Sequence, residues 1–171
     1  ILFFGLIREY KGLDLLINAI GLSKNKLKDL KVLVVGESYE SLDKYHKMIR
    51  DHNMEDSFIF INNFIDKADI EKYFLSSELV ILPYKSASQS GVLSLAYNFN
   101  RPVIVTDVGG LSDYVSHEKS GFIVQPNSKD ISNKINLFFD KNLFEEMSEF
   151  IKKNNKRFSW ESFEGKLNLY G

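Results

Sequence analysis

Six short hydrophobic runs recur along the chain, separated by longer stretches in which apolar residues return every three or four positions. Most of the runs lack polar alternation, and five of the six consist mainly of β-branched or aromatic residues. Such runs are typical of strands that are covered on both faces. The predicted strands are Ile1–Gly5, Val32–Gly36, Phe58–Ile61, Leu79–Leu82, Val103–Thr106 and Phe122–Val124.

The stretches between these runs predict amphipathic helices. Either Asp66 or Asp69 is expected to cap one helix, and Asn127 or Ser128 another. Residues 142–170 predict two further helices with Lys-rich faces. Four helices before residue 142 are predicted from apolar stripes, which are Leu13, Leu16, Ile17 and Ile20, then Tyr45, Met48 and Ile49, then Ile70, Tyr73 and Phe74, and finally Ile131, Ile135 and Phe138.

Strands that alternate with helices over short connections predict an α/β fold. We expect a doubly wound parallel sheet of about six strands, with helices on both faces and a helical C-terminal tail. Residues 1–171 show no internal repeat or linker and are predicted to be one domain. Because there is no initiator Met and residue 1 already lies inside an apolar run, we expect a fragment of a longer chain.

In sheets of this kind, ligands bind beyond the carboxyl ends of the strands. Glycine, serine and charged residues cluster at those ends. The predicted crevice is therefore formed by residues 5–11, 36–37, 62–65, 83–91 and 107–110.

The segment after the fourth predicted strand carries the clearest signal. Small polar residues follow Pro83, and a helix is expected to begin at Ser90 or Gly91. Its free N–H groups and its dipole would attract a phosphorylated ligand. Gly109 and Gly110 predict a turn that opens a further helix, although two glycines also make a plain turn.

Arg8 and Lys11 place two cations in the loop after the first strand. Alone they would be interpreted as a solvated basic loop, but beside a helix N-terminus in the same crevice they favour phosphate binding. Gly36 would allow a ligand close to the backbone. Glu37 is either an acceptor for ligand hydroxyls or a surface carboxylate.

Composition narrows the classes of protein. The 171 residues carry a formal net charge of −1, which offers no overall field toward nucleic acid. There is no cysteine, and the apolar runs are far shorter than the roughly 20 residues that span a bilayer. His46, His52 and His117 lack metal-ligand spacing, so no metal is expected. A Gly-x-Gly-x-x-Gly motif is missing after the first strand, which disfavours a nicotinamide enzyme.

Eight segments follow one another in a characteristic order, namely Phe3–Ile17, Val32–Gly36, Phe58–Ile65, Asp69–Tyr73, Leu79–Tyr84, Gln89–Ala96, Arg101–Gly110 and Gly121–Pro126. They cover roughly residues 1–140, and their order is specific although no single piece would be. The set resembles the C-terminal, nucleotide-sugar-binding domain of group 1 (GT-B fold, retaining) glycosyltransferases.

The resemblance implies a UDP- or GDP-sugar donor, no metal or other cofactor, and hexosyl transfer with retention to a glycan or lipid-linked acceptor held by a missing N-terminal domain. The fragment would then be inactive alone. Arg8 and Lys11 are implied as the catalytic residues that bind the diphosphate and stabilise the departing nucleotide. The implied donor-binding residues are Gly5, Gly36, Glu37, Asn63, Phe64, Ile65, Tyr84, Ser88, Gln89, Ser90, Gly91 and Val92.

The chain departs from the family pattern at several positions. Members commonly carry two glutamates seven residues apart, near the donor sugar and the ribose, where this chain has Ala87 and Leu95. A subgroup manages without the pair, so an inactive enzyme does not follow. The family arginine usually follows the first glycine, where Leu6 stands, and Arg8 lies two residues on. Asn100 replaces a family glycine.

Two other classes stay open. A non-catalytic, response-regulator-like module should carry acidic strand ends, but the corresponding residues are Gly36, Pro83 and Asp107. A sugar-nucleotide epimerase would need catalytic carboxylates and a histidine in the crevice, where few candidates exist and Glu37 is the residue to test. The expected location is cytoplasmic. The lysines of residues 141–156 are interpreted as mostly an exposed helix face, and peripheral contact with the inner face of a membrane is kept as the less favoured alternative.

Overall fold

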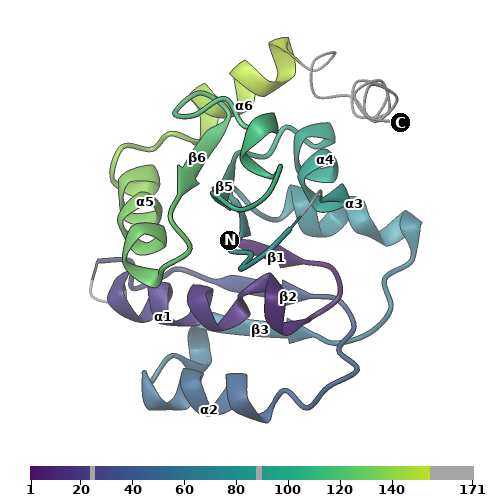
Figure 1. Ribbon diagram of the computed structural model, residues 1–171, viewed down its shortest axis with the longest axis vertical. Coiled ribbons are helices and arrows are strands. Elements are labelled where there is room, and N and C mark those ends of the chain that lie inside the picture. Colours follow the sequence, from purple (N-terminus) through teal and green to yellow (C-terminus); the bar gives the residue numbers. More distant parts are fainter. Residues whose placement is uncertain (24–25, 88–89, 155–171) are drawn as a thin grey trace.

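The computed structural model describes residues 1–23, 26–87 and 90–154. In these ranges one sheet of six parallel strands has the order β3-β2-β1-β4-β5-β6 (Figure 1). The strands are β1 (Leu2–Phe4), β2 (Val32–Val35), β3 (Phe58–Ile61), β4 (Val80–Leu82), β5 (Val103–Thr106) and β6 (Gly121–Val124). The helices are α1 (Leu13–Ser23), α2 (Asp43–Asp51), α3 (Lys67–Leu75), α4 (Gly91–Asn98), α5 (Ser128–Asp140) and α6 (Phe144–Lys153), and three short 3-10 turns are η1 (Glu9–Lys11), η2 (Glu55–Ser57) and η3 (Ser112–Tyr114). The predicted doubly wound fold is confirmed.

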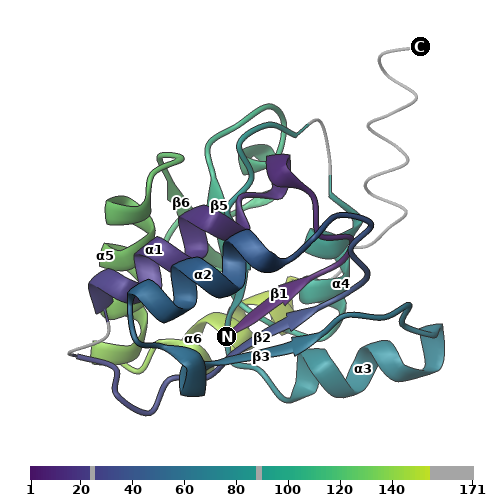
Figure 2. The ribbon, with the colours of Figure 1, turned by 90° about the horizontal axis from the view of Figure 1, so that it is seen from below.

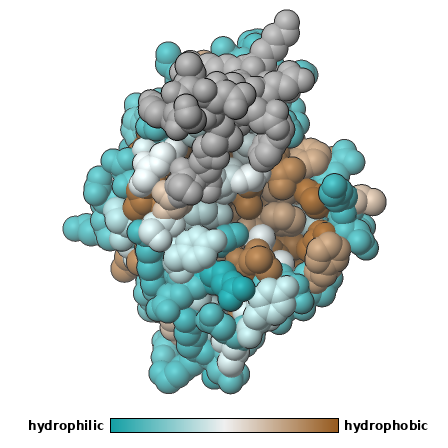
Figure 3. All heavy atoms as spheres, turned by 45° about the vertical axis from the view of Figure 1, so that its right-hand side comes forward, coloured by the Kyte–Doolittle hydropathy of each residue, from teal (hydrophilic) through white to brown (hydrophobic). Residues whose placement is uncertain are grey.

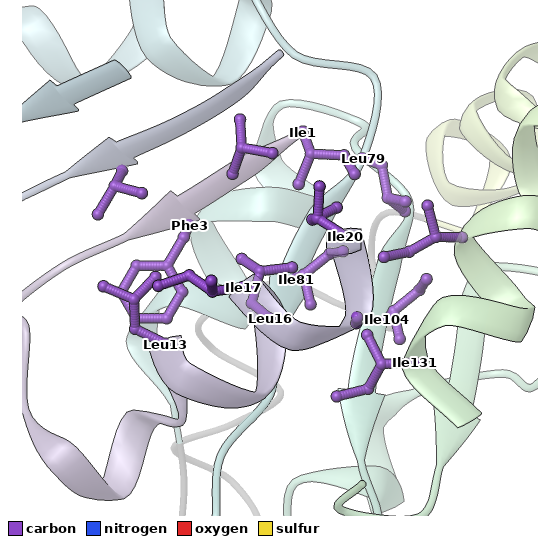
Figure 4. Packing of buried hydrophobic residues seen from close by; sticks show 14 of the residues in the cluster. Ile1, Phe3, Leu13, Leu16, Ile17, Ile20, Leu79, Ile81, Ile104 and Ile131 are labelled. Carbon is purple, nitrogen blue, oxygen red and sulfur yellow. The ribbon is translucent and has the colours of Figure 1, made fainter. Parts of the chain in front are cut away.

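The sheet divides the core into two layers because successive side chains of a strand point to opposite faces. Phe3 and Ile81 face α1 and α5 in one buried cluster (Figure 4). Leu2 and Val80 point the other way, into a cluster with residues of α3 and α4. Figure 2 shows α1 and α2 on one side of the sheet and α3 on the other. Both faces are thus covered, as the unbroken hydrophobic runs predicted.

Most of the predicted helices form, and the start of α5 shows why. Asn127 is its N-cap and accepts a hydrogen bond from the Asp130 N–H at 2.9 Å. Asp66 occupies the N-cap position of α3, but its side chain makes no capping bond. In the tail, α6 is one of the two predicted helices, and the second falls outside the described residues.

The helix expected after Gly109 and Gly110 was a wrong prediction in its extent. Only the three-residue turn η3 forms, and Val115 after it is already extended, with φ −103° and ψ 122°. Gly109 itself has a left-handed φ of +53°. Two glycines and a β-branched valine leave this segment with little helix propensity, which explains why the turn does not continue.

After β3, at one edge of the sheet, the chain crosses to β4, which lies beside β1. The candidate site lies at this crossing point. The register pairs β1 with β4 at one position, Leu2↔Val80, so the strands diverge toward their carboxyl ends. The loops that follow are then held together. The Lys85 N–H donates to the Tyr10 carbonyl at 2.7 Å. Gly12, at φ +70°, lies so close to the Pro83 carbonyl oxygen that a Cβ would be 1.9 Å from it.

Candidate functional site

A cavity of about 760 Å³ lies at this crossing point, between the loop after β1 and the loop after β4. Doubly wound sheets bind their ligands in just this position. The residues that line the cavity come from two segments, η1 and the segment that leads into α4. The lining residues are Tyr10, Lys11, Tyr84, Ser86, Ala87, Ser90 and Gly91.

Lys11 is the charged residue of the cavity wall. Its side chain is only 9% exposed. Its Nζ lies 5.6 Å from the centroid of the Tyr84 ring and 2.9 Å from the position that a Cβ at Gly5 would occupy. Burial lowers the pKa of Lys11, and no acidic side chain in the described ranges offsets that effect. A buried cation without a counter-charge is costly, and a bound anion would remove that cost.

The N-terminus of α4 faces the same cavity without a side-chain cap. Ser90 is the N-cap residue, but its hydroxyl lies 3.2 Å from the Tyr84 hydroxyl and makes no capping bond. Burial raises the pKa of Tyr84 to about 12, so the phenol stays neutral. A Cβ on Gly91 would meet no atom within 4 Å. No side chain of the described residues caps the first N–H groups of α4, and such uncapped groups suit an anion.

An apolar region adjoins the cavity on the α3 and α4 side of the sheet. Phe4, Val35 and Ile61 sit side by side on β1, β2 and β3 because they are paired in register. Figure 3 shows hydrophobic surface gathered on this side of the molecule. Phe64, in the loop after β3, is 72% exposed. The half-buried residues that pack onto this cluster from α3, α4 and their approaches include Ile65, Ile70, Tyr73, Val92 and Leu95.

Arg8 lies in the same loop as Lys11 but outside the cavity wall. Its guanidinium is 5.2 Å from the centroid of the Tyr39 ring, and its Nη1 is 3.9 Å from a Glu40 carboxylate oxygen. The Tyr39 hydroxyl in turn donates to Glu37 at 3.0 Å. Arg8, from the loop after β1, thus joins Glu37, Tyr39 and Glu40 of the loop after β2 in a second polar group.

The structure brings part of the predicted site together. Lys11, Tyr84, Ser90 and Gly91 line the cavity, and Gly5 lies directly under the Lys11 ammonium. Gly36 supports this arrangement at φ +136°, because a Cβ there would be 2.3 Å from the Gly5 carbonyl oxygen.

The other predicted residues lie farther along the rim or outside the described ranges. Asn63 is exposed and donates through Nδ2 to the Phe64 carbonyl at 2.8 Å. Val92 and Ile65 belong to the apolar region. Ser88 and Gln89 lie outside the described residues.

Tyr10 and Ser86 fall within the predicted crevice segments 5–11 and 83–91, but neither is among the implied donor-binding residues. Both line the cavity. The position of Tyr10, immediately before Lys11 on the same loop, was the available signal.

Metal-binding clusters and membrane-spanning helices are two further features to consider. Within residues 1–23, 26–87 and 90–154, no group of three or more His, Cys, Asp or Glu side chains is arranged to hold a metal ion. None of the helices in those ranges has the length and apolar character that crossing a bilayer demands.

The fold and the cavity define a Rossmann-like domain with an anion-attracting crevice at its crossing point. The family model "Glycosyl transferases group 1" matches residues 1–158. The chain therefore belongs to the group 1 glycosyltransferases.

Relatives and solved structures agree with this assignment. A D-inositol 3-phosphate glycosyltransferase of Pseudarthrobacter chlorophenolicus is 28% identical over 127 residues, covering 72% of this chain and 30% of that protein. The C-terminal domain of the group 1 family protein LpcC from Francisella tularensis has a TM-score of 0.82 at 20% identity, covering 93% of this chain and 85% of that one.

A structure of S. aureus TarM, a variant in complex with fondaparinux, α-GlcNAc-glycerol and UDP, has a TM-score of 0.78 at 27% identity, covering 98% of this chain and 35% of that one. The chain spans 30% to 44% of the length of the first curated relatives that it matches.

Proposed function

We propose that this chain is the donor-binding domain of a glycosyltransferase that moves a sugar from a UDP- or GDP-sugar to a glycan or glycolipid acceptor, with retention at the transferred carbon. The observation that carries the proposal is the pairing of buried Lys11 with the uncapped N-terminus of α4 across one cavity. Family membership and the UDP in the TarM structure support it. The acceptor would be held by the rest of a longer protein, at the cytoplasmic side of a membrane.

In this proposal the diphosphate lies between Lys11 and the N–H groups of Gly91 and Val92. Negative charge develops on the departing nucleotide as the sugar is transferred. A fixed cation and fixed N–H dipoles in a partly dry cavity stabilise that charge without reorganising. Arg8 would join by leaving Glu40, an exposed pair that holds it only weakly. The nucleoside would lie on the apolar region, with the base beside residues 63–65.

Calorimetric titration with UDP, GDP and their common sugar conjugates tests the proposal. Binding of one nucleotide is expected, and Lys11→Met should weaken it about tenfold or more, since a charge-assisted contact to phosphate is lost. Lys47→Met is the matched control, because Lys47 is an exposed lysine on α2 paired with Asp51 at 2.8 Å. Equal affinity of the wild type and Lys11→Met would contradict the assignment.

The epimerase and response-regulator alternatives gain little support from the geometry. Glu37 accepts a hydrogen bond from the Tyr39 hydroxyl and does not line the cavity. Asp107 accepts a hydrogen bond from the Ser112 hydroxyl at 2.8 Å, on a separate loop. No second function is therefore proposed.

A further inference from the structure

Tyr10 forms a wall of the cavity that phosphate binding leaves unexplained. Tyr10 is 46% exposed, and it belongs to the lining of the cavity. Its ring stands nearly perpendicular to that of the buried Tyr84, at 76° and 6.1 Å between centroids. The two rings therefore make adjoining walls of one pocket.

The position of Tyr10 is fixed by its surroundings. Its backbone is part of η1, and its carbonyl accepts a hydrogen bond from the Lys85 N–H at 2.7 Å. Lys85 is itself held by Asp14 at 2.8 Å. Because the backbone is held in this way, Tyr10 loses little backbone entropy when a ligand packs on its ring.

The rest of the cavity offers no carboxylate to a sugar. The lining residues in the described ranges contain one cation, two tyrosines, small side chains and no acid. Residues 86–91 read Ser-Ala-Ser-Gln-Ser-Gly, so this loop has no acidic side chain at any position. Recognition of sugar hydroxyls by a carboxylate acceptor is thus not available from the described walls.

We propose that Tyr10 is a specificity-determining residue that packs its ring against the C–H face of the transferred sugar. This inference rests on the proposed function, because it places the sugar beside a diphosphate held by the adjacent Lys11. The electron-rich face of an aromatic ring attracts the partly positive hydrogens of a pyranose C–H face. A pocket that reads a sugar in this way tolerates the loss of a hydroxyl, so the donor class extends to deoxy sugars.

The test measures the sugar increment, which is the dissociation constant of the bare nucleotide divided by that of its sugar conjugate. Tyr10→Ala should lower the increment about two- to tenfold, the range for one aromatic packing contact. Affinity for the bare nucleotide should change little. Tyr10→Phe keeps the ring and should keep the increment. Leu22→Ala is the control, since Leu22 is 62% exposed on α1, away from the cavity.

The outcomes separate the two proposals. If the wild type binds no nucleotide, the proposed function fails and this inference fails with it. If nucleotide binds but Tyr10→Ala keeps the full increment, or the wild type shows none, only this inference is overturned. Loss of the increment in Tyr10→Phe as well would assign the contact to the hydroxyl and overturn the packing role.

Discussion

Among single residues, Lys11 combines burial with a positive charge in the wall of the cavity. A buried ammonium has lost water and gains no carboxylate in the described part of the chain. Arg8 is in the opposite situation, half exposed beside Glu40 and Tyr39. The same loop thus places one cation in the cavity and a second at its rim. The burial of the first, Lys11, should lower the free energy of unfolding of the ligand-free domain.

Replacing Lys11 with methionine should raise the free energy of unfolding by about 0.5–2 kcal/mol near pH 7. The native pKa of Lys11 lies below its unfolded value of 10.5. Below the native pKa the destabilisation is fully present, and it disappears as pH rises through the native pKa toward 10.5. Urea unfolding from pH 7 to pH 10 should show the gap between Lys11→Met and the wild type closing. A constant gap, or a less stable variant, would contradict the burial argument.

Among the elements, α4 combines two unusual features at its first turn. The hydroxyl of its N-cap serine bonds Tyr84 in place of the helix backbone, and a Cβ added to its first residue, Gly91, would contact no neighbouring segment within 4 Å. Strand β5 steadies the same region, because the Thr106 hydroxyl donates to the Tyr84 carbonyl at 2.6 Å. The helix start is therefore held through Tyr84, and no side chain of the described residues caps it.

Gly91→Ala should leave the fold intact and damage binding. The new methyl meets no protein atom, and alanine in place of helical glycine changes stability by about 0.4–1 kcal/mol in the favourable direction. The methyl would stand where phosphate is expected, so nucleotide affinity should fall at least about tenfold.

Gly121→Ala is the converse control for Gly91→Ala. A Cβ at Gly121 would lie 2.1 Å from the Val103 carbonyl oxygen, far along the sheet from the cavity. That variant should lose stability in thermal unfolding without a specific loss of affinity for any molecules that remain folded. Unchanged affinity in Gly91→Ala would place the phosphate elsewhere.

At the scale of the whole molecule, the cavity lies between two halves of one sheet. Its walls come from the loops after β1 and β4, whose strands pair at a single position, Leu2↔Val80. A ligand that bridges the two loops would tie the halves together at the point where strand pairing is thinnest. Binding there should be felt across the domain and not only in the loops.

Bound nucleotide should therefore stabilise the domain as a unit. At a ligand concentration 100 times the dissociation constant, the free energy of unfolding should rise by about 2.7 kcal/mol. Hydrogen exchange with and without nucleotide should slow in β1, β4 and α4 together. Slowing confined to the loop residues 83–87 would show that the ligand does not couple the two halves.

Much of this architecture could be predicted from residue order, for a local reason. Hydrophobic run length, helical periodicity and turn residues depend on near neighbours, so six strands and a parallel sheet followed directly. The rule that ligands meet the carboxyl ends then brought Lys11, Ser90 and Gly91 to one crevice.

Other features depend on contacts between distant segments, which the order of residues does not show. Two loops meet after β1 and β4. Their meeting buries Lys11, brings Ser90 to Tyr84 and makes Tyr10 a wall of the cavity. Arg8, three residues from Lys11, turns to another loop for the same reason. Local patterns specify elements because their forces act along the chain, whereas the chemistry of the site arises where packing brings separate elements together.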